Sequence, residues 1–535
     1  MRKSVLGLAL SAGLCAASGP VLAAATGAPA ETKTVCTATV NSSDEKEAFR
    51  RHLPPGKYRF VELLDAAHDD WLERACRRHV QCDVLVISGH FNAGETFYSD
   101  KVDVEASLKM DELERASCSH SCPPLFAKLK EVYLFGCESL NPHVTQYSSK
   151  YGESGHDRMR RIFAGVPVIY GFSSHAPVGP YAAMLLDRYF AAGGASDVGN
   201  GRASAKLLRI FGRNSLVAIR GARASDPGAG ERRDICEFFD DRESAPAKLA
   251  YIHDMLRRDP SRGRKYLARI ENLVASFDAA TRASPGYQSA LAAFRADEET
   301  RARYLAIAHR APFAVRARML SLAGRLAWLR DEELRTERIA LLDDMLASRT
   351  MGFAEVDLAC SLSARDALPD ALSRVRLPAT SPHPVADSAL LACLGSDTAK
   401  ARILAALASP DDRDVELAQL YLQHRPVADG PQLRALAEAV TRMPPSAAQV
   451  RAFGALARLH IADREILDQL ALAFADAKSV NVQRAIAEVF IRSDPSALPK
   501  PGLAGLLRRH RLESRDGRPD LIDTLIANLE TRAAS

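Results

Sequence analysis

Two side chains that can do chemistry together stand at the ends of two apolar segments. The stretch CDVLVISGH ends on His90, and the stretch VYLFGC ends on Cys137. A cysteine beside an imidazole can give up its proton to become the nucleophilic thiolate, and the protonated imidazole can then protonate a leaving group. His90 and Cys137 therefore predict a hydrolase that works through a thioester, a chemistry that needs no metal or organic cofactor.

Backbone groups next to this pair are candidates for stabilising a developing oxyanion. Gly136 precedes the cysteine, and we expect it to let the chain turn tightly and to leave space for a substrate carbonyl. The N–H of Cys137 is one expected donor, and the turn from Gly89 to Phe91 is expected to supply another. The alternative is that Cys137 is only a packed core residue.

The elements that must position these residues read as an α/β domain. KYRFVELL, CDVLVISGH, VYLFGC and VPVIYGF are apolar runs typical of strands, and amphipathic helical segments separate them. This alternation predicts a sandwich with a mostly parallel sheet and helices on both faces, and residues 31–56 are interpreted as its lead-in. Sites in such sheets lie beyond the carboxyl ends of the strands, so neighbouring strands would bring His90 and Cys137 to one rim.

The remaining length of the chain predicts a second, helical domain. Of the 535 residues, we assign 31–225 to the α/β domain, 226–248 to a Gly-, Pro- and charge-rich linker, and 249–535 to helices. Apolar residues at helical spacing alternate there with short turns, which favours paired-helix units of a HEAT-like solenoid over a helical bundle. The formal charge of +5 is mild and indicates no nucleic-acid partner.

The N-terminal sequence predicts export. A basic pair, an apolar run and a group of small residues make a signal peptide over residues 1–25, with a membrane anchor as the alternative. No later apolar run approaches the roughly 20 residues of a spanning helix, so we expect a periplasmic or secreted protein without a membrane span. Without Cys15, nine cysteines remain, and an odd number in an oxidising compartment leaves one thiol free.

Eight cysteines are therefore expected in disulfides, with Cys137 as the free thiol. Cys76, Cys82, Cys118 and Cys122 allow three pairings, and the sequence does not choose among them, although a bridge from Cys118 or Cys122 to Cys76 or Cys82 would brace the active-site rim. We expect the last two of the eight to pair with each other. Cys36 and Cys236 bracket the α/β domain and are candidates to tie its ends. The eight are Cys36, Cys76, Cys82, Cys118, Cys122, Cys236, Cys360 and Cys393. The short spacings in CRRHVQC and CSHSC could instead hold zinc, although disulfides are favoured in an exported chain.

The order of these features resembles the caspase-like cysteine peptidases of clan CD, most closely the bacterial CHAT and caspase-like group. The resemblance rests on a strand-end histidine, a strand-end cysteine 47 residues later in VYLFGCES, and the strand and helices that follow, and it covers about residues 58–212. It implies His90 as the general base, Cys137 as the nucleophile, and Ser173 and Ser174 near the substrate pocket. Phe91 departs from the family, in which a glycine commonly follows the histidine.

Two functions follow from these expectations. The first is an exported cysteine endopeptidase that cleaves peptide bonds of a protein or peptide substrate through Cys137 and His90. The second is an inactive caspase-like scaffold, in which the helical domain binds a protein partner and the cysteine is merely packed.

Overall fold

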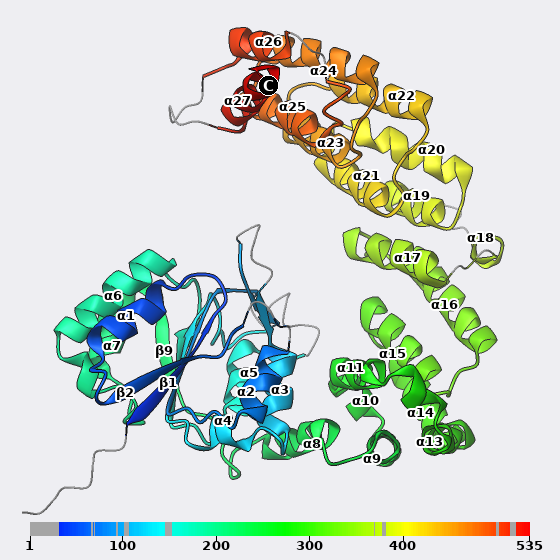
Figure 1. The fold of residues 1–535 in the computed structure, drawn as a ribbon. Coiled ribbons are helices and arrows are strands. Elements are labelled where there is room, and N and C mark those ends of the chain that lie inside the picture. The colour runs from blue at the N-terminus through cyan, green and yellow to red at the C-terminus, as the bar shows by residue number, and fades with distance from the viewer. Residues whose placement is uncertain are drawn as a thin grey trace, which may run out of the picture. The chain divides into compact units, whose positions relative to one another are not determined.

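The computed structural model describes residues 32–65, 68, 70–92, 95–100, 106–144, 152–366, 368, 370–376, 381–498, 502–513 and 520–534. The chain divides into two compact units that meet between Arg242 and Glu243, inside the segment predicted to be a linker (Figure 1). Helix α8 (Ala229–Phe239) occupies part of that segment and belongs to the first unit. The signal peptide predicted for residues 1–25 lies outside the described residues.

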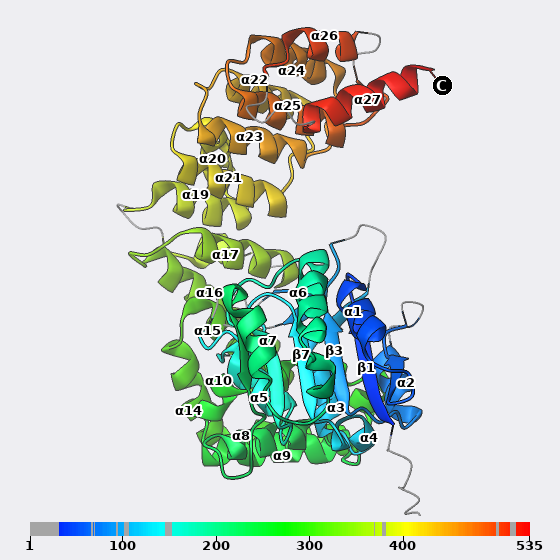
Figure 2. The ribbon, with the colours of Figure 1, turned by 90° about the vertical axis from the view of Figure 1, so that its left-hand side faces the viewer.

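A six-stranded sheet forms the centre of the first unit (Figure 2). Its strand order is β2-β1-β3-β7-β8-β9, and every neighbouring pair is parallel except β8 and β9. The strands are β1 (Lys33–Thr39), β2 (Tyr58–Glu62), β3 (Val84–Ser88), β7 (Glu131–Phe135), β8 (Val168–Phe172) and β9 (Leu216–Ile219). The mostly parallel sheet confirms the fold class that the sequence predicts.

The interpretation of residues 31–56 as a lead-in is wrong. Strand β1 lies inside the sheet between β2 and β3, and helix α1 (Asp44–His52) follows it. The sequence of β1, KTVCTAT, mixes threonine with apolar residues, and because of the threonine hydroxyls the segment resembles a polar loop in sequence. Threonine is β-branched and suits a strand, and here five consecutive residues of β1 are buried.

Alternate residues of the strands point into two separate cores, one on each face of the sheet. In β7, Tyr133 and Phe135 face one core, and Val132 and Leu134 face the other. The first core is covered by α1, α6 (Gly179–Ala191) and α7 (Ala205–Ile210) (Figure 1). The second is covered by α2 (Trp71–Arg77), α3 (Met110–Cys118), α4 (Pro123–Ala127) and α5 (Gly155–Ile162). The predicted sandwich with helices on both faces is thus confirmed.

A second, small sheet follows β3, where the sequence indicates only a polar excursion. Its three antiparallel strands are β4 (His90–Phe91), β5 (Thr96–Tyr98) and β6 (Ser107–Lys109), in that order. The rings of Phe91 and Phe97 pack with centroids 4.5 Å apart and hold β4 on β5. The short strands place His90 on a paired element rather than on a free loop.

Four disulfides are present, and they agree only partly with the pairing expected from sequence. The pairs Cys76–Cys122 and Cys360–Cys393 are among those predicted. Cys36 and Cys236 do not tie the ends of the domain together: Cys36 bonds Cys82 across neighbouring strands, and Cys236 bonds Cys118. The Cys36–Cys82 bond follows from β1, whose neighbour in the sheet is β3, and the sequence does not reveal β1 as a strand. Four disulfides fit an exported protein.

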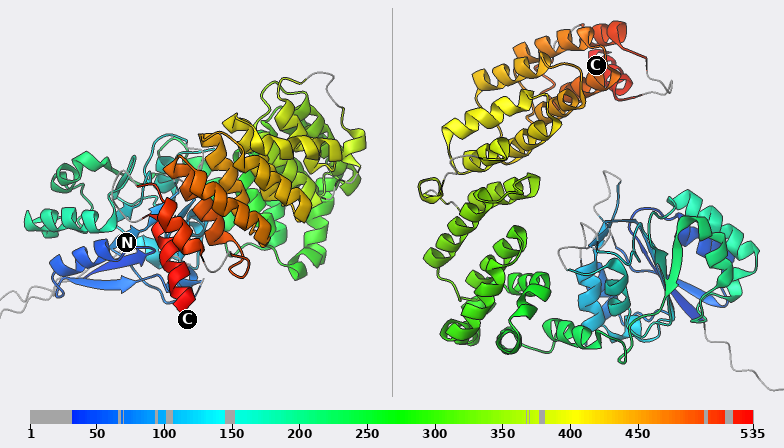
Figure 3. Two further views of the ribbon diagram at one scale, coloured as in Figure 1. Left: turned by 90° about the horizontal axis from the view of Figure 1, so that it is seen from above. Right: turned by 180° about the vertical axis from the view of Figure 1, so that it is seen from behind.

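The second unit is helical throughout the part that the structure describes (Figure 3). The first residues of α21, α23 and α25 are 35 and 33 positions apart, and a second helix follows each of them, so paired helices recur as the sequence predicts. None of the described helices is long and apolar enough to cross a bilayer. The helices are α9 (Ala245–Arg258), α10 (Ser261–Lys265), α11 (Leu267–Ser276), α12 (Ala279–Ala283), α13 (Pro285–Ala296), α14 (Glu298–His309), α15 (Phe313–Arg325), α16 (Asp331–Leu346), α17 (Phe353–Asp366), α18 (Ala371–Arg374), α19 (Pro384–Cys393), α20 (Asp397–Ala405), α21 (Asp412–His424), α22 (Gly430–Thr441), α23 (Ala447–Ala457), α24 (Arg464–Asp476), α25 (Val480–Arg492), α26 (Leu503–His510) and α27 (Leu521–Ala534).

Candidate functional site

Strands β3 and β7 are hydrogen-bonded neighbours, and they end at the same edge of the sheet. Their register pairs residues that are 47 positions apart, and the last pair is Ser88 with Phe135. The ladder continues one step further, because the N–H of Gly89 donates to the carbonyl of Phe135 at 3.1 Å. His90 and Cys137 each come two positions after the end of one of these strands, and His90 begins β4 of the small sheet.

Cys137 is the one cysteine outside a disulfide among those the structure describes, and its side chain is half-buried. The backbone N–H of Ala176, in the segment after β8, donates to its Sγ over 3.4 Å. A donor at this position complements negative charge on the sulfur. The thiol is thus reduced, reachable and contacted by a neighbouring loop.

The residue after the cysteine has an unfavourable backbone conformation. Glu138 has φ of +56°, a left-handed geometry that costs a non-glycine residue about 1–2 kcal/mol. Its N–H donates to the carbonyl of Ser174 at 2.7 Å, and this contact helps to hold the turn. Non-glycine residues in this region of φ and ψ cluster at functional sites, so the turn after Cys137 is a candidate for one.

The turn is also anchored to β8. The Ser139 hydroxyl accepts from the N–H of Phe172 at 3.1 Å, and the N–H of Leu140 donates to the carbonyl of the same phenylalanine at 2.9 Å. At Gly171 in β8, an added Cβ would lie 2.7 Å from both Leu140 and the Ser139 hydroxyl, so the close approach needs glycine there. These contacts fix the position of the Cys137 backbone.

His90 begins β4 and pairs with Tyr98 of β5, with the two rings 5.6 Å apart at their centroids. Its side chain is 39% exposed, and its Nε2 lies 3.1 Å from a carboxylate oxygen of Asp100. Desolvation raises the pKa of Asp100, but hydrogen bonds from His90 and Asn41 and the charge of His90 outweigh it, so the pKa lies below its ordinary value. This contact orients the His90 imidazole so that its Nε2 points toward the Asp100 carboxylate.

Asn41 connects this histidine–carboxylate pair to the large sheet. It comes two residues after β1, accepts a hydrogen bond from the Ser99 hydroxyl at 3.0 Å, and hydrogen-bonds Asp100. Neither Asn41 nor Asp100 is among the residues predicted from the sequence. Asn41 could have been found had β1 been recognised, whereas no sequence signal distinguishes Asp100 within its polar segment.

The surroundings of Gly136 differ from the expectation. An added Cβ would lie 2.6 Å from the Phe97 ring and 2.7 Å from Cβ of Phe91, so aromatic side chains fill the space expected for a substrate carbonyl. The left-handed turn falls two residues later, at Glu138. The N–H of Gly89 is also engaged by Phe135, which removes one expected oxyanion donor.

Ser173 and Ser174 lie beside the Cys137 turn, but their hydroxyls face a different neighbour. The Ser173 hydroxyl donates to the carbonyl of Ser215 at 3.3 Å, and the Ser174 hydroxyl lies 2.8 Å from the hydroxyl of the same serine. Through its backbone carbonyl, Ser174 contacts Glu138. Both serines therefore join the end of β8 to the start of β9, and Ser174 also supports the turn after the cysteine.

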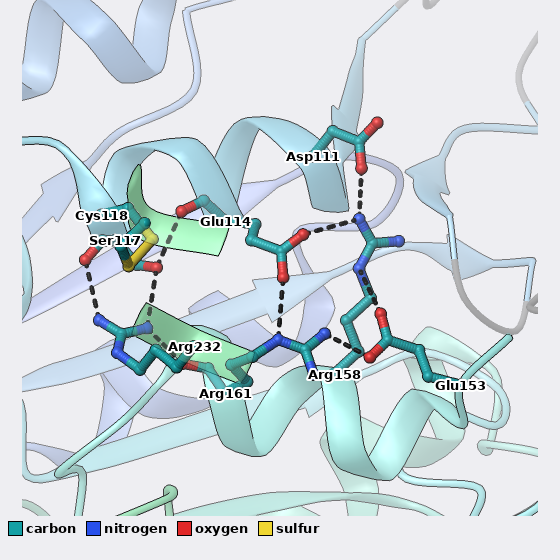
Figure 4. A network of polar contacts seen from close by, with 9 residues as sticks. Asp111, Glu114, Ser117, Cys118, Glu153, Arg158, Arg161 and Arg232 are labelled. Carbon is teal, nitrogen blue, oxygen red and sulfur yellow. Dashed lines mark hydrogen bonds and ion pairs between the residues drawn. A yellow bond between two sulfur atoms is a disulfide. The ribbon is translucent and has the colours of Figure 1, made fainter. Parts of the chain in front are cut away.

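A buried ion network joins the two helices that follow the site elements (Figure 4). Arg161 of α5 lies 3.2 Å from Glu114 of α3 and also pairs with Glu153, while Arg158 pairs with Asp111 and Glu114. Both arginines and Glu114 are buried. Buried charges need partners to offset their loss of hydration, and these groups supply them for one another.

The position of this network connects it to the candidate site. Helix α3 follows the small sheet that carries His90, and α5 follows the turn after Cys137. Arg232 of α8 adds a hydrogen bond to the carbonyl of Ser117, next to the Cys118–Cys236 disulfide (Figure 4). The network and the disulfide thus fix the two site-bearing segments relative to each other.

A zinc site at the short cysteine spacings does not fit the structure. Cys76, Cys82, Cys118 and Cys122 all form disulfides, so their sulfurs are not available as thiolate ligands. Across the described ranges, no group of three or more histidine, cysteine, aspartate or glutamate side chains could hold a metal ion.

Comparison with known proteins gives no match to a family model, a curated protein or a solved structure. The caspase-like resemblance therefore stays a prediction from the residues. What the structure adds is the geometry at the carboxyl edge of the sheet, and function is argued from that geometry.

Proposed function

We propose that the first unit is a cysteine endopeptidase of the caspase-like type, in which Cys137 attacks a peptide bond and His90 moves the proton. The observation that carries this proposal is that β3 and β7 are neighbouring parallel strands and that His90 and Cys137 each come two residues after the end of one of them. The free thiol supports it, because the eight other described cysteines form disulfides and this one does not.

The proposed reaction needs only groups of this chain, substrate and water. His90 takes the thiol proton as Cys137 Sγ attacks the carbonyl carbon, and a tetrahedral oxyanion forms. The C–N bond then breaks, His90 returns the proton to the leaving amine, and a thioester remains. Water attacks the thioester with His90 as base, which releases the carboxylic acid and regenerates the thiol. The Cys137 N–H is the proposed oxyanion donor.

Asp100 enters the proposal as the residue that positions His90. With Nε2 directed to the carboxylate, the other ring nitrogen, Nδ1, is the one left to exchange a proton with the sulfur. The carboxylate also favours the imidazolium that forms when the thiol loses its proton. Because Asp100 is exposed, we assign it orientation rather than a large electrostatic contribution.

The rival function, an inactive scaffold, is favoured by two contacts. The Gly89 N–H is already bonded, and Phe91 and Phe97 occupy the space beside Gly136. The first contact removes a hydrogen-bond donor that a tetrahedral intermediate would need, and the second reduces the space available to it. In this alternative the helical unit would carry the function by binding a protein partner.

Alkylation by iodoacetamide without reductant separates the two functions. For the enzyme, we expect rapid labelling confined to Cys137, and at least tenfold slower labelling in His90→Ala, because the proton acceptor is gone. His156→Ala is the matched control, since this histidine pairs with Asp157 and leaves the dyad intact. Equal rates in wild type and His90→Ala would refute the dyad.

Peptide hydrolysis is then tested with a peptide library. Wild type should cleave a subset of peptides, and Cys137→Ala should cleave none. Asp100→Asn should retain cleavage at a rate reduced roughly tenfold, with a shifted pH profile, as expected for a residue that orients the base. Cleavage that survives in Cys137→Ala would place the activity elsewhere.

A further inference from the structure

His175, in the loop after β8, lies between two backbone contacts to the turn that carries the candidate thiol. On one side of it, the carbonyl of Ser174 accepts a hydrogen bond from the N–H of Glu138 at 2.7 Å. On the other side, the N–H of Ala176 donates to Sγ of Cys137 at 3.4 Å. The backbone of His175 therefore lies directly beside the cysteine.

The contact of Ala176 limits how far His175 can be from the sulfur. Standard bond lengths place the Cα of a residue about 2.4 Å from the nitrogen of the next residue. Because the Ala176 nitrogen is 3.4 Å from Sγ, the Cα of His175 lies within about 6 Å of the sulfur. The His175 side chain is exposed, and it makes no hydrogen bond or ion pair with any residue that the structure describes. The ring can thus turn toward a group bound at the thiol.

The strand order puts Cys137 between two strands that are each followed by a histidine. Strand β7, which ends just before the cysteine, has β3 on one side and β8 on the other. His90 comes two residues after the end of β3, and His175 comes three residues after the end of β8. Within the described residues, only His90 of these two pairs with a carboxylate. One imidazole is therefore oriented, and the other can move.

We propose that His175 is a second proton-transfer residue of this site, which protonates the leaving amine while His90 keeps the thiol proton. This inference rests on the proposed function, and it moves one of its proton transfers from His90 to His175. A ring oriented by Asp100 suits the sulfur, whose position is fixed. A ring that can turn suits the amine nitrogen, which moves away as its bond breaks.

The protons balance over one turnover. His90 takes the thiol proton as Sγ attacks the carbonyl carbon, and His175, starting as the imidazolium, gives its proton to the amine as the C–N bond breaks. The neutral His175 then takes a proton from the water that attacks the thioester. The C–S bond breaks, the carboxylic acid leaves, and His90 returns its proton to the sulfur. Both rings and the thiol regain their starting states.

Substrates with different leaving groups test this role. p-Nitrophenolate leaves as an anion, so its burst from p-nitrophenyl acetate reports attack by the thiol alone, whereas an amine must be protonated to leave. His175→Ala should slow cleavage of the peptide library about a hundredfold, but the burst and iodoacetamide alkylation by less than about twofold. His90→Ala should slow all of these reactions.

Two further measurements separate proton transfer from a structural role. His175→Gln keeps hydrogen-bonding groups but cannot transfer a proton, so it should cleave peptides as slowly as His175→Ala. Free imidazole in the buffer should restore part of the cleavage by His175→Ala, because the position is exposed, and none in Cys137→Ala. His156→Ala, which removes a histidine paired with Asp157, is the matched control.

The outcomes distinguish this inference from the function on which it rests. Peptide cleavage by His175→Ala or His175→Gln at the wild-type rate would overturn the role of His175 and leave the dyad standing. A burst slowed as much as peptide cleavage would also overturn it, because the residue would then act on the thiol and not on the leaving amine. No peptide cleavage by wild type would overturn the endopeptidase function and this inference together.

Discussion

Polar groups at the two ends of strand β7 have opposite surroundings. We call the edge of the large sheet where β7 begins, at Glu131, the closed edge, and the edge where β7 ends, near Cys137, the open edge. Where β7 begins, buried Glu131 accepts from the N–H groups of Asn200 and Gly201, each at 2.9 Å, and from the Tyr133 hydroxyl at 2.8 Å. Where β7 ends, Cys137 keeps a reduced, half-exposed thiol. Burial raises the pKa of Glu131 in spite of its hydrogen bonds.

This difference separates structural from chemical use of polar residues. A carboxylate that accepts hydrogen bonds from fixed donors, as Glu131 does, stabilises the fold. Its oxygens are already occupied and are not available to bind a ligand. At the other end, a thiol outside the disulfides, a partly exposed imidazole and a residue with positive φ are the candidates for chemistry. Substitutions at the first edge should therefore change the free energy of unfolding, and those at the second should change reactivity.

The largest effect is expected at the closed edge. Glu131→Ala removes a buried carboxylate that accepts from two backbone N–H groups and from the buried Tyr133 hydroxyl, and it should lower the free energy of unfolding by about 3–5 kcal/mol. Urea unfolding measures it, with Glu73→Ala, an exposed acid on α2, changing stability by less than about 0.5 kcal/mol. The rate of Cys137 alkylation in the folded variant should equal that of wild type. A loss below about 1 kcal/mol would contradict the comparison.

A buried carboxyl near the open edge should make stability depend on pH. Burial, aided by the charge of Asp44, raises the pKa of Glu45 to about 7, against the opposing hydrogen bonds from its backbone and Ser88. Between pH 4.5 and 7 the folded protein therefore holds a proton that the unfolded chain has lost, so stability falls as the pH rises through this range. The loss by pH 8 is about 3 kcal/mol.

Glu45→Gln removes this titration. We expect it to flatten the pH dependence and to raise the free energy of unfolding at pH 8 by up to about 3 kcal/mol, with little change at pH 4.5. Glu47→Gln, on an exposed position of α1, is the matched control and should retain the wild-type slope. Denaturant midpoints at pH 5, 6, 7 and 8 measure both, and identical slopes for Glu45→Gln and wild type would exclude this origin.

A methyl group at the junction of the two sheets should affect stability and reactivity together. Gly136→Ala places Cβ against the rings of Phe91 and Phe97, which should cost about 1–3 kcal/mol. Because Phe91 adjoins His90, alkylation of Cys137 should also slow. Gly212→Ala is the control, since its Cβ would meet nothing within 4 Å. Unchanged alkylation in a destabilised Gly136→Ala would separate the packing from the site.

The smallest effect is expected at the strained turn. Glu138→Gly relieves the left-handed conformation and should raise the free energy of unfolding by about 0.5–1 kcal/mol. Glu138→Ala keeps the strain and should not stabilise. Thermal unfolding compares the two variants, and equal midpoints would mean that the backbone at this position carries no strain.

The sequence predicted the strands that are most apolar, and it missed the elements whose signals are mixed. Continuous apolar runs identified β3, β7 and β8, because a strand covered on both faces must be apolar throughout. Strand β1 was not predicted because its threonines interrupt the apolar pattern. The disulfide partner of Cys36 was misassigned as a result. The small sheet was not predicted because strands of two or three residues are too short to show a hydrophobic periodicity.

The sequence by itself determined the types and the local places of the candidate groups: a histidine and a cysteine, each just after a buried strand. Only the tertiary structure decided which strands are neighbours, that Asp100 reaches His90, and that aromatic rings fill the space beside Gly136. The physical reason is that apolar patterning is local along the chain, whereas strand pairing and side-chain contacts join residues that are distant in sequence and depend on the packing of the whole domain.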